Sequence, residues 1–393
     1  MSARRIYLDH TAGRPVDARV EEAMLPFMTK FYGNPSSLHS FSQEARGALE
    51  EARGKVARLV DAEKRETIAF TSGATESNNL AVKGVAERNK SQGKHIITSS
   101  IEHMSVRNPC KYLSTQGFNV TFLPVDNYGF VNLESLENEL TDQTILVSVM
   151  YANGEIGTIQ HIKEISQIVH RKNAVLHVDA TAACGQIPID VKNDGIDLLT
   201  ISSSDMYGPK GVGALYVKDG VRVSPLMHGG GQERGLRSGT ENLPGIVGFG
   251  RAAEIAEKEM QVESERLRKL RDRLIKGLLA PTPYSFLNGH PTERLPDNAA
   301  VRFSFIEGES MLLNLDMLGI AASSGSACTA KTLEASHVLL AIGLKHEEAH
   351  GSLLFTLGRQ NTAEEVDYVI SVMPGIVKKL RAISPLTPKE LSE

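Results

Sequence analysis

The feature that most constrains the fold of this chain is a regular alternation of short, β-branched apolar runs with longer helical patterns. The apolar runs are 67–71, 95–99, 119–125, 144–151, 174–180, 198–202 and 213–217. Several are apolar at almost every position, as expected of strands that helices cover on both faces of a sheet. Segments between them, such as 36–60 and 161–173, have helical patterns. This rhythm predicts an α/β domain with a mostly parallel sheet.

The pattern changes near Thr240, where almost continuous helical periodicity begins. Within it, leucines recur along one helical face, at Leu267, Leu270, Leu274 and Leu278. We therefore expect a long amphipathic helix that leads from the sheet to a second domain. That domain would contain an apolar run at 298–305 and a charged C-terminal helix ending near 380–386.

Charge and cysteine content exclude several classes of protein. A formal net charge of −4 gives no electrostatic reason to expect binding to nucleic acid or to an anionic membrane. No run approaches the roughly 18 apolar residues that a membrane span needs, and the first ten residues lack the apolar core of a signal peptide. The three cysteines are too few and too widely spaced for a disulfide framework. We expect a cytoplasmic protein that binds neither nucleic acid nor membrane.

The stretch "FTSGATESNN" (70–79) is a candidate phosphate site. Gly73 permits a tight turn at the end of a strand, and Thr75 opens a helix. Free N–H groups and the positive end of the helix dipole would then point at one spot, which suits a phosphate. The alternative is an ordinary helix start, at which Thr75 or Ser77 only caps the helix.

Asp179 ends the apolar run in "LHVDATAAC" (176–184). Its carboxylate would lie at the carboxyl edge of the sheet, where α/β proteins bind ligands. An acid there can keep a ring nitrogen protonated, or it can simply cap a helix.

The glycine-rich loop 227–242 carries arginines and hydroxyls that suit an anion. An ordinary surface loop explains that segment equally well.

Cys328 differs from the other two cysteines in its surroundings. Cys110 and Cys184 fall in apolar patterns and are expected to be buried, like most cysteines. Cys328 stands among small polar residues in "ASSGSACTAKT" (322–332), which indicates an exposed loop where a thiol can react.

Seven stretches of this chain occur in the order and spacing typical of one enzyme family, and together they span most of its length. They are "TSGATESNN", "SIEHMSV", "HVDAT", "YGPKGVGALYV", "GGGQERGLRSGT", "EGES" and "SSGSAC". The chain thereby resembles the cysteine desulfurases of the NifS/IscS type. The resemblance implies a homodimer of the fold-type I class of pyridoxal phosphate (PLP) enzymes. Such enzymes have a large α/β domain with a mostly parallel sheet and a smaller α+β domain. By that resemblance we expect residues 15–255 to form the large domain, and 1–14 with 256–393 to form the small one.

The resemblance also implies roles for individual residues. Those expected to hold the PLP phosphate are Ala74, Thr75, Ser202 and, from the other subunit, Thr240. His103 would stack on the cofactor ring, and Asp179 would pair with the ring nitrogen. Cys328 would accept sulfur from cysteine as a persulfide and pass it to an IscU-type scaffold protein that builds iron–sulfur clusters.

The chain departs from the family at its reaction centre. Where the family reads S-G-H-K-x-Y-G-P-K-G, this chain reads "SSSDMYGPKG" (202–211), so that Asp205 replaces the lysine that links PLP covalently. Further replacements affect the same expected pocket: Ser204 for histidine, Gly154 for asparagine, Ala182 for glutamine, Leu354 for the arginine that clamps the substrate carboxylate, and "HTAG" (10–13) for N-A-A-T.

These departures predict weak chemistry on cysteine. An aspartate cannot form the covalent link, and loss of general acid–base help alone costs about 10²–10⁴ in rate. The Asp205 carboxylate would also repel PLP, which is itself anionic. Two like charges ~4 Å apart repel by roughly 4 kcal/mol at an effective dielectric of about 20. We therefore expect PLP to bind weakly and non-covalently, or to be vestigial. Lys210 has a counterpart in the family beside the lost lysine, which favours a structural role for it.

Three functional hypotheses follow. The first is a desulfurase-like protein of iron–sulfur cluster assembly with impaired or absent desulfurase activity. In it, Cys328 would transfer sulfur or act as a metal ligand to a cluster shared with the scaffold. The second is an active PLP-dependent cysteine desulfurase. The third is a different reaction, in which Asp205 is the catalytic acid or base.

Overall fold

The computed structural model describes residues 5–325 and 335–389. Its central feature is a seven-stranded sheet with the order β2-β8-β7-β6-β5-β3-β4. The strands are β2 (Ile68–Thr71), β3 (His95–Ser99), β4 (Asn119–Leu123), β5 (Thr144–Met150), β6 (Val175–Asp179), β7 (Leu198–Ser202) and β8 (Gly213–Val217). All neighbouring pairs are parallel except the two that involve β8. Every apolar run predicted as a strand forms one, and the mostly parallel sheet is confirmed.

Helices cover both faces of this sheet, as its buried strands require. They are α1 (Ala18–Thr29), α2 (Ser40–Leu59), α3 (Ala74–Asn89), α4 (Met104–Thr115), α5 (Leu133–Glu139) and α6 (Ile162–Val169). The helix predicted over 36–60 begins only at Ser40. The preceding residues form a turn instead, in which the Ser36 amide donates to the side-chain oxygen of Asn34 at 2.9 Å.

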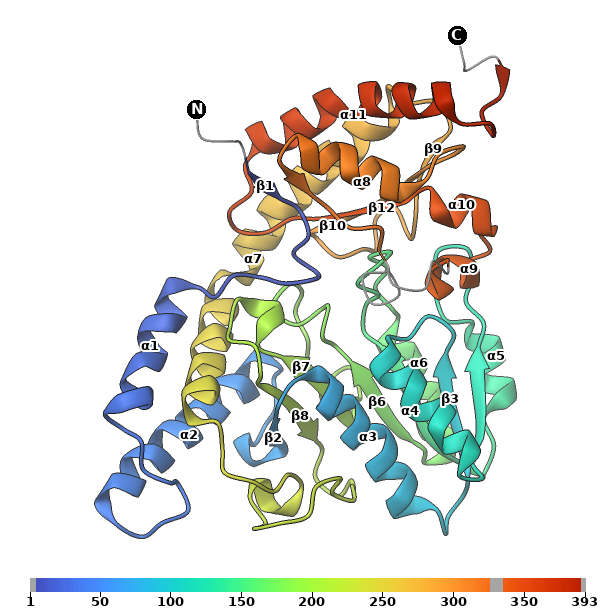
Figure 1. Cartoon of the computed structure of the whole chain (residues 1–393). Coiled ribbons are helices and arrows are strands. Elements are labelled where there is room, and N and C mark those ends of the chain that lie inside the picture. Colours follow the sequence, from blue (N-terminus) through green and yellow to red (C-terminus); the bar gives the residue numbers. More distant parts are fainter. Residues whose placement is uncertain (1–4, 326–334, 390–393) are drawn as a thin grey trace.

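The long helix predicted from the leucine spacing is α7 (Leu243–Leu279). Its first half packs on α1 and α2, and its second half packs on α11 (Ala363–Ile383), as Figure 1 shows. Leu267, Leu270, Leu274 and Leu278 are all buried and belong to a second apolar core. The helix therefore joins the large sheet to a second layered unit.

Within the described residues, that second unit contains two small sheets and four further helices. The antiparallel sheet has the order β12-β10-β9, and β1 pairs in parallel with β11. The elements are β1 (Ile6–Tyr7), β9 (Ser285–Leu287), β10 (Asn298–Phe303), α8 (Gly308–Met317), β11 (Ile320–Ala321), α9 (His337–Ala341), α10 (His346–His350), β12 (Ser352–Thr356) and α11. The N-terminal strand thus belongs to the C-terminal unit. The domain boundaries expected above stay a prediction.

Short 3-10 turns complete the described chain: η1 (Arg65–Thr67), η2 (His170–Lys172), η3 (Ser204–Met206) and η4 (Glu233–Gly235). Among the described helices, none has an apolar stretch long enough to cross a bilayer.

Candidate functional site

A cavity of about 280 Å³ lies where the large sheet meets the second unit. It is formed at the carboxyl ends of β6 and β7, by residues that follow β3 and β5, and by the facing strand β12. This is the edge of a parallel sheet at which α/β proteins bind ligands. Among its lining residues are Ala74, His103, Asp179, Asp205 and Leu354. The structure therefore brings together many of the positions singled out in the sequence.

Asp205 lies in the 3-10 turn η3 that directly follows β7. Its Oδ2 accepts a hydrogen bond from Ser204 Oγ at 3.2 Å, and Ser204 Oγ lies 3.0 Å from Ser202 Oγ. Burial raises the pKa of Asp205, against the lowering effect of Arg14 and the two serine hydroxyls. The side chain at this position is therefore a hydrogen-bonded carboxyl group, with no amine to offer.

Arg14 brings a positive charge to the same cavity. Its Nη2 donates to Oδ2 of Asp297 at 2.8 Å, and both side chains are buried. The guanidinium group also lies over the ring of Tyr207, 5.3 Å from the ring centre. Burial alone would lower the pKa of Arg14, but Asp297, Tyr207 and Asp205 raise it. The positive charge of Arg14 is thus stabilised by these neighbours and interacts electrostatically with Asp205.

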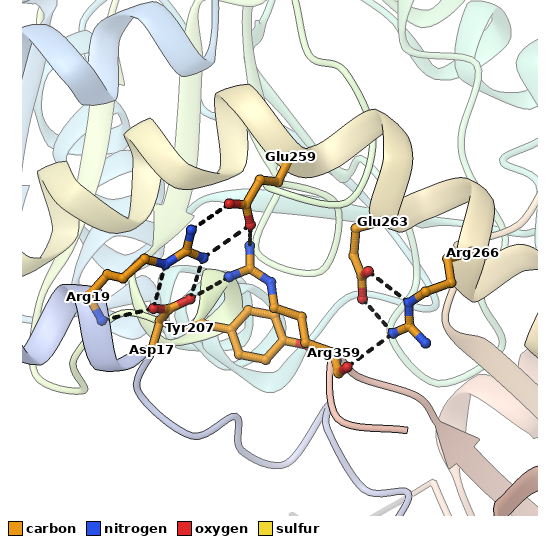
Figure 2. Close-up of polar contacts among 7 residues, drawn as sticks. All are labelled: Asp17, Arg19, Tyr207, Glu259, Glu263, Arg266 and Arg359. Atoms are coloured by element: carbon orange, nitrogen blue, oxygen red, sulfur yellow. Dashed lines mark hydrogen bonds and ion pairs between the residues drawn. The ribbon is translucent and has the colours of Figure 1, made fainter. Parts of the chain in front are cut away.

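Tyr207 ties the turn that carries Asp205 to the second unit (Figure 2). Its backbone has a positive φ of 62°, which few residues other than glycine adopt. Its carbonyl accepts from the Asp17 amide at 2.9 Å, and its hydroxyl accepts from the Arg359 amide at 2.9 Å. The Arg359 guanidinium stacks on the ring at 4.6 Å and donates to the Asp17 carboxylate. Figure 2 shows Glu259 and Arg19 extending this network to α7 and α1.

Asp179 is held rigidly at the end of β6. Its Oδ1 accepts from the backbone and side chain of Thr181, at 3.0 and 2.5 Å, and its Oδ2 accepts from Asn78 Nδ2 at 2.7 Å. No described helix follows it directly, so the alternative of a helix cap is wrong. Thr181 forms a local turn with it instead.

The start of α3 has the geometry of an anion site. Gly73 precedes the helix with φ 147°, a conformation that side chains rarely tolerate, and no side chain caps the helix at that position. The alternative that Thr75 or Ser77 caps the helix is therefore wrong. Ser77 pairs with Thr71, with 2.7 Å between the hydroxyl oxygens, and Glu76 accepts from the Ser72 amide. The amides at the start of α3 have no intrahelical acceptors and remain available to an anion.

The remaining predicted residues lie in different surroundings. His103 precedes α4, lines the cavity and has Nδ1 2.7 Å from Ser105 Oγ. Ser202 is buried, and its hydroxyl is paired with Ser204. Thr240 is exposed and is not part of the cavity lining of its own chain. Cys328 lies outside the described residues.

The departures from the family pattern converge in space. Gly154, Ala182, Asp205 and Leu354 all line the cavity, whereas Ser204 does not. A methyl group added at Gly154 would lie 3.6 Å from that of Ala182 and 3.4 Å from Thr11. Positions that are far apart in the sequence thus change the same wall of one pocket.

Four ionisable residues of this cavity, other than histidines, were not predicted from the sequence: Asp9, Arg14, Glu102 and Glu155. Burial raises the pKa of Glu102 and of Glu155 to about 8. One carboxyl oxygen of each is buried without a hydrogen-bond partner among the described residues. Three of these residues stand beside or within positions already singled out in the sequence. Arg14 directly follows "HTAG", Glu102 belongs to "SIEHMSV", and Glu155 directly follows the replaced Gly154.

The two other cysteines are not candidates for chemistry. Cys110 and Cys184 are both buried, as expected, and burial raises the pKa of each thiol to about 12. A thiol with such a pKa stays protonated near neutral pH and is a poor nucleophile.

Comparison with known proteins identifies the architecture. The family model described as aminotransferase class-V matches residues 6–369. The chain belongs to the class-V aminotransferase family. It is 61% identical over 380 residues to "Cysteine desulfurase IscS 1" of Archaeoglobus fulgidus, covering 97% of this chain and 99% of that protein. It is 54% identical to "Cysteine desulfurase IscS" of Methanosarcina thermophila, covering 98% and 95% of the two chains.

A solved structure supports the same assignment. A NifS-like protein superposes with a TM-score of 0.90 at 41% sequence identity, covering 96% of this chain and 100% of that one. The resemblance to NifS/IscS-type cysteine desulfurases and the fold-type I architecture, both predicted from the sequence, are confirmed. This class-V aminotransferase fold implies PLP as the cofactor.

Proposed function

We propose that the protein is a cysteine desulfurase-like component of iron–sulfur cluster assembly whose desulfurase activity is impaired or absent. The observation that carries this proposal is the position of Asp205. A carboxyl group, hydrogen-bonded to Ser204, lines the cavity where the family's lysine would link PLP. Arg14 lines the same cavity, and its charge favours the ionised form of Asp205 against the effect of burial.

The cavity fits PLP as a non-covalently held group. The amides at the start of α3, around Ala74 and Thr75, would hold its phosphate, together with Ser202 and, from a second subunit, Thr240. Asp179 would keep the ring nitrogen protonated, and His103 would cover the ring. When bound, PLP would supply an electron sink for bonds to the substrate's α-carbon. Asp205 can exchange a proton, but it cannot anchor the cofactor.

The residues at the expected substrate and cofactor positions also weaken the binding of both molecules. Leu354 offers no charge to the substrate carboxylate, and Gly154 and Ala182 offer no side-chain hydrogen bonds to the phenolate oxygen of the PLP ring. A lost hydrogen bond to a charged group is worth about 1.5–3 kcal/mol. We therefore expect Cys328 to carry sulfur delivered by another route, or to act as a ligand to a cluster held with an IscU-type scaffold. We also expect a cytoplasmic homodimer.

The proposal is tested by replacing Cys328 in the complex with an IscU-type scaffold. Cys328→Ser is expected to lower the sulfur transferred to the scaffold, or the cluster content of the complex. Cys184→Ala is the matched control, because it removes a buried thiol with little change in volume. Unchanged cluster content and sulfur transfer in Cys328→Ser would refute the role of this cysteine.

The second candidate is an active PLP-dependent cysteine desulfurase, which would produce alanine and a Cys328 persulfide. It is favoured by the intact hydrogen bonds around Asp179 and by the open start of α3. The visible absorption spectrum of freshly purified protein separates the candidates, since it reports bound PLP, a cluster or neither. A third candidate, chemistry that uses Asp205 as acid or base, has no substrate that these residues suggest.

A further inference from the structure

Arg14 has hydrogen-bonding capacity that the described protein does not use. Its side chain is 5% exposed and lines the cavity, and Nη2 is engaged by Asp297 at 2.8 Å. Its Nε is buried and has no hydrogen-bond partner among the described residues. A buried donor without a partner is costly, and a charged one more so. An anion in the cavity would remove that cost.

The segment that carries Arg14 runs beside the strand that carries Leu354. Asp9 pairs with Thr356 of β12, and the Thr11 amide donates to Thr356 Oγ1 at 2.9 Å. Leu354 stands two residues before Thr356, and side chains two apart on a strand share a face. Arg14 and Leu354 therefore line the cavity from adjacent segments.

We propose that Arg14 binds the carboxylate of a small amino acid or thiol acid in this cavity, and so takes the place of a cationic clamp at position 354. The choice of ligand rests on the proposed function, but binding itself needs no turnover. A guanidinium edge matches the two oxygens of a carboxylate in a bidentate pair. The Tyr207 ring, 5.3 Å from the guanidinium carbon, helps to fix the orientation of that edge.

Asp205 competes with such a ligand. The charge of its carboxyl group interacts with that of Arg14. Ionised Asp205 would therefore oppose the binding of an anion to Arg14. Replacing it by a neutral side chain of the same shape removes the competing charge. Asp205→Asn is therefore expected to tighten binding of the carboxylate.

The probe is 3-mercaptopropionate, which is cysteine without its amino group and cannot react with PLP as an amine. Its dissociation constant is measured by titration calorimetry on the full-length protein. Arg14→Gln is expected to weaken binding about tenfold or more, and Asp205→Asn is expected to strengthen it. Arg359→Gln is the matched control, because Arg359 also stacks on Tyr207 but does not line the cavity. It is expected to leave the dissociation constant within about twofold.

Inorganic phosphate is the second probe, and its affinity is expected to be insensitive to Arg14→Gln. Equal affinity of the wild type and Arg14→Gln for 3-mercaptopropionate would overturn the inference, as would no binding by the wild type at millimolar concentrations. An equal loss of phosphate and carboxylate binding would overturn the assignment to a carboxylate. If Arg14→Gln does not fold, Arg14→Lys replaces it. Weaker binding of 3-mercaptopropionate is then expected, because lysine lacks the paired N–H donors of the guanidinium group. Fast sulfide release by the wild type would overturn the proposed function and leave these binding results intact.

Discussion

The side-chain amide of Asn78, on α3, donates a hydrogen bond to the Asp179 carboxylate at the end of β6, with 2.7 Å between Nδ2 and Oδ2. Both residues are buried, and Asn78 also donates to Ser105 Oγ at 2.8 Å. The helix that presents its start to an anion and the strand that presents a carboxylate are therefore fixed to one another. The distance between the two proposed anchors of PLP depends on this contact.

Asn78→Ala is expected to lower the free energy of unfolding by about 1–3 kcal/mol, because it leaves a buried carboxylate with one donor fewer. It should also weaken PLP binding, since Asp179 loses its fixed orientation. Chemical unfolding and PLP titration measure the two effects. Asn79→Ala is the control, because in the described part of the chain the side-chain amide of Asn79 donates only to the backbone of its own helix, at 2.9 Å. Equal effects of the two substitutions would contradict a specific role for the buried contact.

Asp205→Lys is expected to restore a covalent bond to PLP. The amine would enter a cavity whose other proposed PLP contacts, the start of α3 and Asp179, are in place. The bond is detected as a change in visible absorbance and by trapping with borohydride. Asp205→Asn is the matched control, which removes the charge without supplying an amine. A lysine variant that borohydride does not trap would show that the cavity no longer admits PLP.

Turnover of cysteine by Asp205→Lys is expected to stay low until Leu354→Arg is added. The added arginine restores a charged hydrogen bond worth about 1.5–3 kcal/mol, which corresponds to roughly tenfold or more in kcat/KM. Leu354→Met is the control for a long side chain without charge. Full activity from the lysine substitution alone would contradict the need for a positive charge at position 354 in turnover.

Glu102 predicts how stability depends on pH. Burial raises its pKa to about 8, so the folded protein keeps a proton that the unfolded chain releases at much lower pH. Its contribution to stability is complete below the unfolded pKa and is lost as the pH rises through about 8. Glu102→Gln should therefore flatten the fall in melting temperature between pH 5 and 8, whereas exposed Glu134→Gln should not. An unchanged pH profile would mean that Glu102 is ionised in the folded protein.

The strands and the long helix could be predicted because each is encoded locally. Apolar runs such as 198–202 contain more consecutive apolar residues than an exposed loop does, and the spacing of Leu267 to Leu278 repeats over several turns of α7. The start of α2 could not be placed, because Asn34 and Pro35 form a turn whose hydrogen bonds only the structure reveals. The pairing of β1 with β11 was equally hidden, since it joins residues more than three hundred apart in the sequence.

Residues of the candidate site that belong to sequence motifs could be predicted, whereas isolated charged residues could not. Asp179 ends a strand and Asp205 follows one, so their place at the sheet edge follows from the pattern. Arg14 has no motif of its own, and its role depends on Asp297 and Tyr207, which approach it from distant segments. The buried state of Glu155 likewise depends on packing that no local pattern encodes.

Impaired desulfurase activity is tested by measuring sulfide and alanine release from L-cysteine for the wild type and for the Asp205→Lys, Leu354→Arg double variant, both with saturating PLP. Because the wild type lacks both the lysine amine and the charge at position 354, the double variant should be faster by about 10² or more. Equal and rapid turnover by the wild type would contradict it, and would establish an active desulfurase that works without the lysine.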